Sequence, residues 1–382
     1  MPTNRNAFIK QARRVVIKAG SGMLTGNGGL NTRVINNLSG DICGLMERGV
    51  EVVLVSSGAI ASGLKKLGMT KRPKSISKKQ ATAAVGQSSL IMAYEKAFAR
   101  CGKTVAQILI TRDDFNNRNR YLNARNTIFT LLEWGVTPVI NENDTVAFEE
   151  IKFGDNDNLS AMVANMTEAN LLINLTDMDG LFDKDPRKNK DAVLIRVVEK
   201  LNSDVIRCAG ADAGTLGTGG MASKVAAARK VALRGIPAII ANGTRRGVLQ
   251  DIFSGKDIGT LFLPHEKAFC GRKHWIAFSK APKGRLVIDG GAADALRRNG
   301  KSLLPSGVRE ATGDFVRGDS VIILDKDGVE LAVGMTNYSS EEVKKIMGLK
   351  SSEIESVLGY KDDDEVIHRD NMAITDGITD GE

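Results

Sequence analysis

A regular alternation of apolar strands and helices is the feature of this sequence that most constrains its fold. Between residues 14 and 263, short apolar runs end in small or polar residues, and segments with helical spacing follow them. This alternation predicts an α/β three-layer sandwich, in which helices cover both faces of a mainly parallel sheet. The predicted strands are residues 14–18, 50–55, 105–110, 136–140, 171–175 and 236–242, and the predicted helices are residues 30–48, 59–68, 79–100, 118–133, 159–169 and 225–234.

The most polar loop of the chain follows the predicted strand 136–140. Two clusters of carboxylates and carboxamides, residues 141–144 and residues 155–158, lie in this loop. Their charges would repel one another unless cations or ammonium groups neutralise them. A solvated acidic turn is the alternative, but such a turn needs only one Asx or Gly signal. Because ligands bind at the carboxyl ends of parallel strands, we interpret this loop as catalytic.

Three further loops have small residues that let backbone N–H groups approach an anion. Lys18 precedes the first of them, residues 19–22. Ser57 lies in the second, where the role of helix N-cap is an equally good explanation for a serine. Lys224 closes the third, residues 217–224. None of these loops fits the G-x-x-x-x-G-K-[ST] pattern of a P-loop, and residues 225–250, which follow the third loop, lack the acidic residue of a dinucleotide-binding fold.

The remaining residue types exclude several classes of protein. The four cysteines have no C-x-x-C spacing, which argues against a zinc site, a redox pair or a disulfide framework. All three histidines follow the acidic loop in sequence, so we expect neither a histidine-based triad nor a dedicated metal site. No run approaches the ~18 apolar residues of a membrane helix, and the N-terminal segment has no apolar core of signal-peptide length. We therefore expect a cytoplasmic protein that does not contact membranes.

The sequence changes in character after about residue 270, where short strands and Gly-rich turns replace the alternation. We predict a first domain, residues 1–265, a small β-rich domain, residues 271–350, and an acidic tail, residues 351–382. The tail contains ten acidic and two basic residues, so we expect it to be partly solvated. In the β-rich domain, the predicted strands are residues 275–278, 284–289, 319–325 and 328–334, and the one predicted helix is residues 292–298.

Several motifs taken together resemble those of the glutamate 5-kinases, a branch of the amino-acid kinase family. These motifs are VVIKAGSG, VVLVSSGAI, NENDTV with FGDNDNLSA, LTDMDGLFDKDP and GTGGMASK. Residues 271–350, with LLPSGV, GDFVRGDSV and VGMTNY, resemble a PUA domain and imply a small β-barrel. One departure is visible, because Gly22 stands where the family usually has a second Ser or Thr.

The resemblance implies a kinase that transfers phosphate from ATP to the γ-carboxylate of L-glutamate, in the first step of proline synthesis. Lys18 and Lys224 would hold the ATP phosphates, and Asp157 would position their two ammonium groups. The glutamate contacts it implies are Ser57, Asp144 and Asn156. The nucleotide contacts it implies are Lys18, Thr176, Asp177, Thr218, Gly219, Gly220, Met221, Ala222, Ser223 and Lys224. It also implies Mg²⁺ entering with ATP, proline as a feedback inhibitor, and a homo-oligomer.

Two alternatives stay open. The first is another carboxylate or carbamate kinase of the same fold. The second is an RNA-binding protein that acts through the PUA-like domain. We treat RNA binding as secondary, because aromatic residues make up only 5% of the chain and no strong base-stacking surface is evident.

Overall fold

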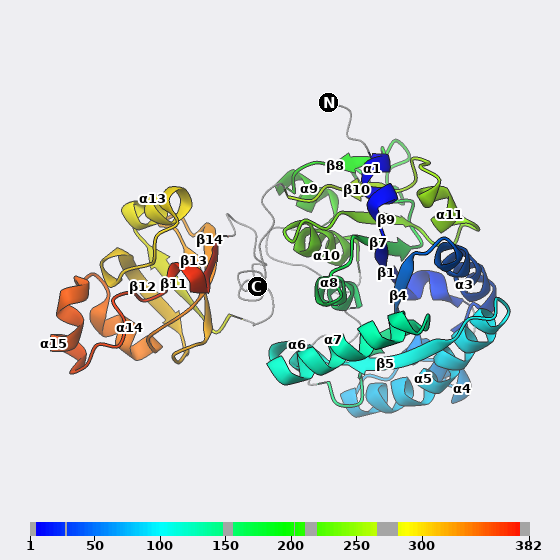
Figure 1. Cartoon of the computed structure of the whole chain (residues 1–382), viewed down its shortest axis with the longest axis horizontal. Coiled ribbons are helices and arrows are strands. Elements are labelled where there is room, and N and C mark those ends of the chain that lie inside the picture. The colour runs from blue at the N-terminus through cyan, green and yellow to red at the C-terminus, as the bar shows by residue number, and fades with distance from the viewer. Residues whose placement is uncertain are drawn as a thin grey trace. The chain divides into compact units, whose positions relative to one another are not determined.

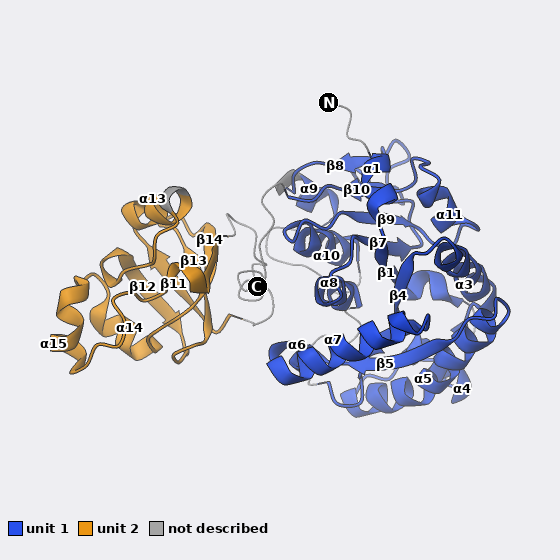
Figure 2. Ribbon diagram, viewed as in Figure 1, with its two compact units in different colours: residues 1–268, 382 blue, residues 269–381 orange. Residues whose placement is uncertain are grey.

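The computed structural model describes residues 5–26, 29–147, 156–201, 203–210, 220–265 and 282–374. The chain divides into two compact units, one built from residues 1–268 and the other from residues 269–381 (Figure 2). Each unit has its own hydrophobic core.

A mainly parallel sheet forms the centre of the first unit. In the described residues it has eight strands, in the order β5-β6-β4-β1-β7-β9-β10-β8. The one antiparallel pairing among them joins β9 to β10. The strands are β1 Arg14–Ala19, β4 Glu51–Ser56, β5 Val105–Ile110, β6 Thr137–Glu142, β7 Leu171–Thr176, β8 Val197–Val198, β9 Ala238–Asn242 and β10 Thr260–Phe262; a short hairpin pairs β2 Thr25–Gly26 with β3 Gly29–Leu30.

Helices cover both faces of this sheet, because successive side chains of a strand point to opposite faces. In β1, Val15 and Ile17 belong to one core and Val16 belongs to the other. Figure 1 shows α3 and α11 on one side of the strands and α8 and α10 on the other. The first core contains residues of α1 Arg5–Gln11, α2 Ser21–Leu24, α3 Thr32–Glu47, α4 Ala59–Lys66, α5 Ile76–Ala99 and α11 Val248–Phe253. The second contains residues of α6 Arg112–Asn116, α7 Arg118–Glu133, α8 Asn156–Met166, α9 Ser203–Cys208 and α10 Met221–Ala232.

The three-layer α/β architecture predicted from the alternation is therefore confirmed. Several helices begin earlier than the sequence pattern predicted, and two of them, α8 and α10, contain predicted site residues. The helix α8 begins at Asn156 rather than at residue 159, and α10 begins at Met221 rather than at residue 225. Asp157 and Lys224 thus lie in the first turns of helices, although the sequence pattern placed both in loops. None of the described helices is long and apolar enough to cross a membrane.

The second unit is β-rich, as predicted. Its described residues contain a five-stranded sheet in the order β12-β11-β13-β14-β15, in which β11 and β13 are parallel and the other neighbours are antiparallel. The predicted strand 275–278 lies outside the described residues. The strands are β11 Gly284–Ile288, β12 Val308–Gly313, β13 Ser320–Leu324, β14 Glu330–Met335 and β15 Met372–Ile374; the helices are α13 Gly290–Asn299, α14 Ser340–Ile346 and α15 Ile354–Leu358, with 3₁₀ turns η1 Pro305–Gly307, η2 Ser351–Glu353 and η3 Arg369–Asn371.

The segment from residue 351 is not a separate solvated tail over its described part. Ile354 and Val366 are fully buried in the core of the second unit, and β15 pairs with β14. The acidic residues of this segment indicated exposure to solvent. Its apolar side chains, however, are buried, and this burial holds residues 351–374 against the sheet.

A close crossing of α4 and α5 fixes the loop that connects β4 to α4. A Cβ atom on Gly63 would lie 1.8 Å from the carbonyl oxygen of Thr82, and one on Gly86 would lie 1.8 Å from that of Ala59. No side chain fits at either position. The two glycines therefore let the helix backbones touch, which sets the position of the amino end of α4.

Gly86→Ala tests this crossing. The added methyl group must push α4 away from α5, so we expect a loss of about 1–3 kcal/mol in the free energy of unfolding. Gly40→Ala is the matched control, because Gly40 is exposed in the middle of α3 and a Cβ there meets nothing within 4 Å. The control should be neutral or stabilising by up to about 1 kcal/mol. Urea unfolding followed by circular dichroism measures both, and equal stabilities for the two variants would contradict the close crossing.

Candidate active site

The carboxyl ends of four neighbouring strands bring the predicted site residues to one edge of the sheet. In the register of the sheet, Lys18 of β1 lies beside Asn174 of β7 and beside Val55 of β4. Ser57 follows β4 directly, and Asn141 lies near the end of β6. Parallel strands place all their carboxyl ends at the same edge, so these polar groups lie together although they are far apart in sequence.

Asp157 forms the centre of a buried ion cluster at this edge. Its carboxylate lies 2.5 Å from Lys18 Nζ through Oδ1 and 3.1 Å from Lys224 Nζ through Oδ2. The side chain of Asp157 is 2% exposed, and those of the two lysines are 5% and 7% exposed. Two ammonium groups and one carboxylate leave a net charge of +1 in a nearly dry environment. Such a cluster attracts anions strongly, because little solvent screens it.

Two further side chains hold the Asp157 carboxylate. Asn174 Nδ2 donates to Oδ1 over 3.0 Å, and the Ser223 hydroxyl lies 2.6 Å from Oδ2. The same hydroxyl lies 2.8 Å from the carbonyl oxygen of Gly220, so its single proton serves one of these two acceptors at a time. Together these contacts fix the orientation of the carboxylate and hence the positions of both ammonium groups.

The electrostatic environment keeps Asp157 ionised. Burial alone would raise the pKa of its carboxyl group, but the charges of Lys18 and Lys224 outweigh burial and hold this pKa well below its usual range. Hydrogen bonds from Lys18 and Ser223 act in the same direction. Asp157 is therefore a fixed negative charge near neutral pH and a poor proton acceptor.

The amino end of α10 faces the same cluster. The helix begins after Gly220, and Lys224 in its first turn also lies 3.3 Å from the Gly220 carbonyl oxygen. The first N–H groups of a helix have no acceptor within that helix, so this end adds donors and partial positive charge. Of the predicted residues, Gly220, Met221, Ala222 and Ser223 lie here, and Thr218 and Gly219 lie outside the described residues.

The loop after β1 packs against the end of β7. Gly20 donates its N–H to the carbonyl oxygen of Leu175 over 3.0 Å. A Cβ on Gly22 would lie 3.2 Å from the carboxylate carbon of Asp177, so a side chain there would press on that group. Thr176 is buried and donates its hydroxyl to Asp177. The glycine that departs from the family pattern thus leaves room for the Asp177 carboxylate.

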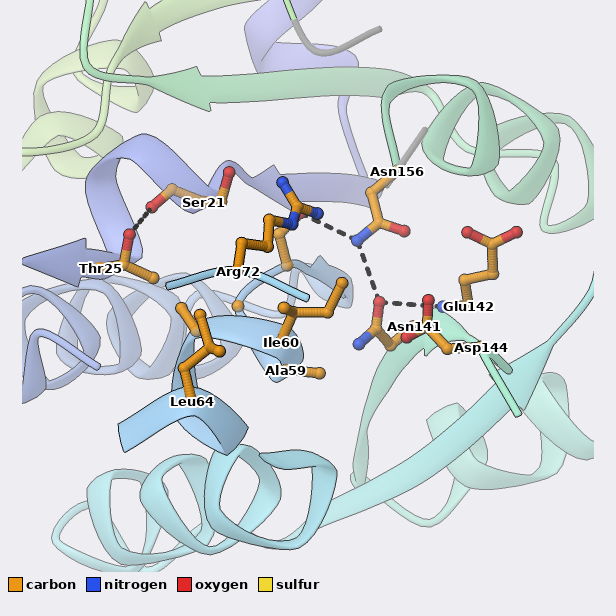
Figure 3. Close-up of a pocket in the computed structure, with 13 residues that line it drawn as sticks. Ser21, Thr25, Ala59, Ile60, Leu64, Arg72, Asn141, Glu142, Asp144 and Asn156 are labelled. Carbon is orange, nitrogen blue, oxygen red and sulfur yellow. Dashed lines mark hydrogen bonds between the residues drawn. The ribbon is translucent and has the colours of Figure 1, made fainter. Parts of the chain in front are cut away.

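A cavity of about 260 Å³ lies beside the ion cluster (Figure 3). Asn156, the residue before Asp157, lies on its wall. The Asn156 Nδ2 atom is within 3.0 Å of the Ser56 carbonyl, the Ser57 hydroxyl and Asn141 Oδ1, while its own Oδ1 is buried without a hydrogen-bond partner. The cavity lining consists of Ser21, Thr25, Ser57, Gly58, Ala59, Ile60, Ala61, Leu64, Arg72, Asn141, Glu142, Asp144 and Asn156.

Asp144 gives this cavity a titratable carboxyl group. Burial raises its pKa to about 6, although the positive charge of Arg72 lowers it in part. A carboxylate that has lost part of its hydration is ready to bind a cation, because ion pairing restores the stabilisation that burial removed. The cavity thus has a group suited to an ammonium ion.

The structure assembles the predicted residues into two groups. Lys18, Asp157 and Lys224 form the ion cluster, and Ser57, Asp144 and Asn156 line the cavity. Sequence reasoning missed Asn174 and Arg72 as site residues. Asn174 had a detectable signal, since it is the one polar residue inside the apolar run LLINL. Arg72 had no such signal, because it belongs to a segment rich in lysine.

The described residues contain no group of three or more His, Cys, Asp or Glu side chains that could hold a metal ion. The Asp157 carboxylate already contacts Lys18 and Lys224, so it is not a vacant ligand.

Comparisons with known proteins place these features in a family context. The sequence profile of the amino acid kinase family matches residues 13–242, and that of the PUA domain matches residues 284–358. The chain is 52% identical to the glutamate 5-kinase of Syntrophotalea carbinolica over 97% of its own length and 99% of that protein. It is 50% identical to the glutamate 5-kinase of Geobacter sulfurreducens over 97% of its length and 100% of that protein. Among solved structures, UMP kinase from Bacillus anthracis matches 68% of this chain and 99% of its own, with 19% identity and a TM-score of 0.47.

Asp157→Asn tests the ion cluster by stability. An amide in place of the carboxylate leaves two buried ammonium groups without a counter-charge, which should cost about 3–5 kcal/mol. Asp191→Asn, which removes an exposed partner of Lys184, should change stability by less than about 1 kcal/mol. Chemical denaturation of the purified proteins measures both.

The pH dependence of this loss follows from the lowered pKa of Asp157. The contribution of the carboxylate is fully present above the pKa of an unfolded aspartate, about 3.9, and is lost only as the pH falls through the lower folded value. The stability difference between the native protein and Asp157→Asn should therefore stay constant from pH 5 to 8 and shrink below about pH 4. A difference that already shrinks between pH 8 and 6 would contradict the cluster.

Proposed function

The chain belongs to the amino acid kinase family, among its glutamate 5-kinases, and from this premise we propose which of its residues carry out the reaction. The reaction is the ATP-dependent phosphorylation of the γ-carboxylate of L-glutamate, which begins proline synthesis. L-glutamate and ATP are the substrates, and the acceptor is a carboxyl group.

The observation that carries the assignment of residues is the Lys18–Asp157–Lys224 cluster beside the cavity. A γ-carboxyl group has a reference pKa of about 4.3, so it is ionised and nucleophilic near neutral pH. No general base is needed, which fits a site whose central carboxylate is held in its ionised form by two lysines. The reaction needs in-line positioning and positive charge around the oxygens of the transferring phosphoryl group.

Lys18 and Lys224 supply that positive charge in our proposal. They approach the Asp157 carboxylate from β1 and α10, which come from opposite ends of the first unit's sequence. Asp157 reduces the repulsion between the two ammonium groups and sets their spacing. Because the groups are already fixed, little reorganisation is required when charge develops in the transition state.

The nucleotide lies over the amino end of α10 and the end of β7. Gly220, Met221, Ala222 and Ser223 offer small side chains and N–H donors to the phosphates, and Thr218 and Gly219 precede them in sequence. Thr176 and Asp177 end the neighbouring strand and complete this side of the site. Mg²⁺ enters as part of the Mg-ATP substrate.

Glutamate occupies the cavity beside the lysines. Ser57 and Asn156, which contact each other on the cavity wall and of which Asn156 directly precedes Asp157, direct the γ-carboxylate toward the phosphoryl group. Asp144 pairs with the α-ammonium group. This positive charge stabilises the partly buried Asp144 carboxylate. A substrate with a free α-ammonium group fits this cavity better than an N-acylated one, because an acyl group would leave the Asp144 carboxylate unpaired.

Proline is our candidate for a feedback inhibitor in the same cavity, since it carries an ammonium and a carboxylate on one carbon and has no γ-carboxylate to phosphorylate. Homo-oligomer formation and RNA binding by the second unit stay predictions from the resemblance, and a cytoplasmic location stays a prediction from the sequence pattern.

Lys18→Ala and Lys224→Ala test the assignment of the two lysines. Each should lower kcat by roughly 10²–10³-fold, as the loss of one fixed donor to a transition state does. Lys256→Ala is the matched control, because Lys256 pairs with Asp251 in an exposed ion pair and should leave kcat within about twofold. Glutamate-dependent ADP release, with hydroxylamine to trap the acyl phosphate, measures the reaction. A near-normal kcat in both lysine variants would contradict the proposed roles.

The pH profile tests Asp144. Its carboxyl group loses its negative charge as the pH falls through about 6, so kcat/KM for L-glutamate should decrease below this pH, by up to tenfold per pH unit. Asp144→Asn should have a lower kcat/KM at pH 8 and a flatter profile from pH 5 to 8. The value of kcat/KM for ATP at saturating glutamate is the internal control. Identical profile shapes for the native protein and Asp144→Asn would show that another group titrates.

A further inference from the structure

Two charged side chains that line the substrate cavity, Arg72 and Glu142, have no function in the roles assigned above, and Arg72 is the one cationic side chain among the described lining residues. Arg72 lies on its wall, in the connection between α4 and α5, while Asp144 and Glu142 reach the cavity from the end of β6. Figure 3 shows Arg72 and Asp144 entering from different segments of the chain, with Asn156 on a third. The cavity therefore has a positive and a negative group at separate places.

We propose that Arg72 binds the α-carboxylate of L-glutamate and so restricts the reaction to α-amino acids. This inference rests on the proposed function, in which Asp144 binds the α-ammonium group of the same substrate. Each of the two charged groups on the α-carbon of the substrate would then contact a different residue.

The Arg72 guanidinium is available for this contact. Within the described part of the chain, no hydrogen bond or ion pair involves Arg72. A guanidinium has five N–H donors in a planar fork that matches a carboxylate with two parallel bonds. An arginine that lines a cavity and has no partner among the described residues is therefore suited to a carboxylate ligand.

The relation between Arg72 and Asp144 also fits a zwitterion. Arg72 is close enough to lower the pKa of Asp144 in part, yet no ion pair joins the two side chains. A ligand with an ammonium and a carboxylate on one carbon can bridge such a gap and pair with both groups. Neither group alone distinguishes glutamate from a compound that has lost one of its two α-substituents.

The position of the lysine cluster determines which end of the substrate faces which part of the cavity. The γ-carboxylate must reach the phosphoryl group near Lys18 and Lys224, and Asn156 on the cavity wall is the neighbour of Asp157 in that cluster. The γ-carboxylate therefore points toward Asn156. This leaves the α-carboxylate for Arg72.

The backbone around Arg72 holds it in place. Pro73, which follows it, is buried, and a proline restricts the preceding residue to extended conformations. The close crossing of α4 and α5 fixes the two ends of the connection. The side chain therefore starts from a defined point, which lowers the entropy cost of binding a carboxylate.

Truncated substrates test the proposal. 4-Aminobutyrate is glutamate without its α-carboxylate, and glutarate is glutamate without its α-ammonium group. We expect Arg72→Gln to lower kcat/KM for L-glutamate and for glutarate by roughly 10–100-fold, through KM, with kcat within about threefold. For 4-aminobutyrate, Arg72→Gln should behave like the native protein. Where a compound is not phosphorylated, its Ki as a competitor of L-glutamate replaces kcat/KM.

Three further variants sharpen the test. Arg72→Lys keeps the charge without the planar fork, so it should recover part of the lost discrimination. Asp144→Ala should give the opposite pattern, with glutarate unaffected and 4-aminobutyrate weakened. Lys74→Gln is the matched control, because it removes an exposed positive charge from the same connection without lining the cavity, and it should leave the preference for L-glutamate unchanged.

The outcomes separate the explanations. An equal loss for L-glutamate and 4-aminobutyrate would overturn the α-carboxylate contact and favour a general electrostatic effect. A fall in kcat for every substrate would overturn it in favour of a contact with the phosphoryl group. No difference between Arg72→Gln and Lys74→Gln would show that Arg72 is only a solvated cation. If the native protein itself had no glutamate-dependent turnover, the proposed function would fail first, independently of Arg72.

Discussion

The buried contact of one carboxylate with two ammonium groups is the interaction on which the rest of this site depends. Asp157 joins Lys18 from β1 to Lys224 from α10, in an environment where an unpaired charge of either sign would be very costly. The carboxylate is also held by Asn174 and Ser223. A cluster fixed in this way can present positive charge to a phosphoryl group without moving.

The sheet explains why such a cluster can form at all. Its central strands β4, β1 and β7 are parallel neighbours, so their carboxyl ends lie at one edge, and the amino ends of α8 and α10 reach the same edge. Each element contributes only one or two polar groups. The charged groups of the cluster are therefore far apart in sequence and close together only in space.

The cavity beside the cluster combines rigid walls with a separated pair of charges. Gly63 and Gly86 let α4 and α5 touch, and this contact places the amino end of α4 at the wall of the cavity. Asp144 comes from the strand end on another side. In our proposal, the specificity of the site for an amino acid depends on groups that are positioned by helix packing rather than by the lysine cluster itself.

The sequence alone determined the three-layer α/β fold, the β-rich character of the second unit and the segments that contain the two lysines and Asp157, because strand and helix periods and the types of neighbouring residues are local properties. Only the tertiary structure decided that Lys18, Asp157 and Lys224 share one carboxylate contact, that residues 351–374 complete the second unit's sheet, and that Asn174 and Arg72 reach the site. The physical reason is that a distance between side chains remote in sequence depends on strand order and helix packing, and no local pattern of residues encodes either of them.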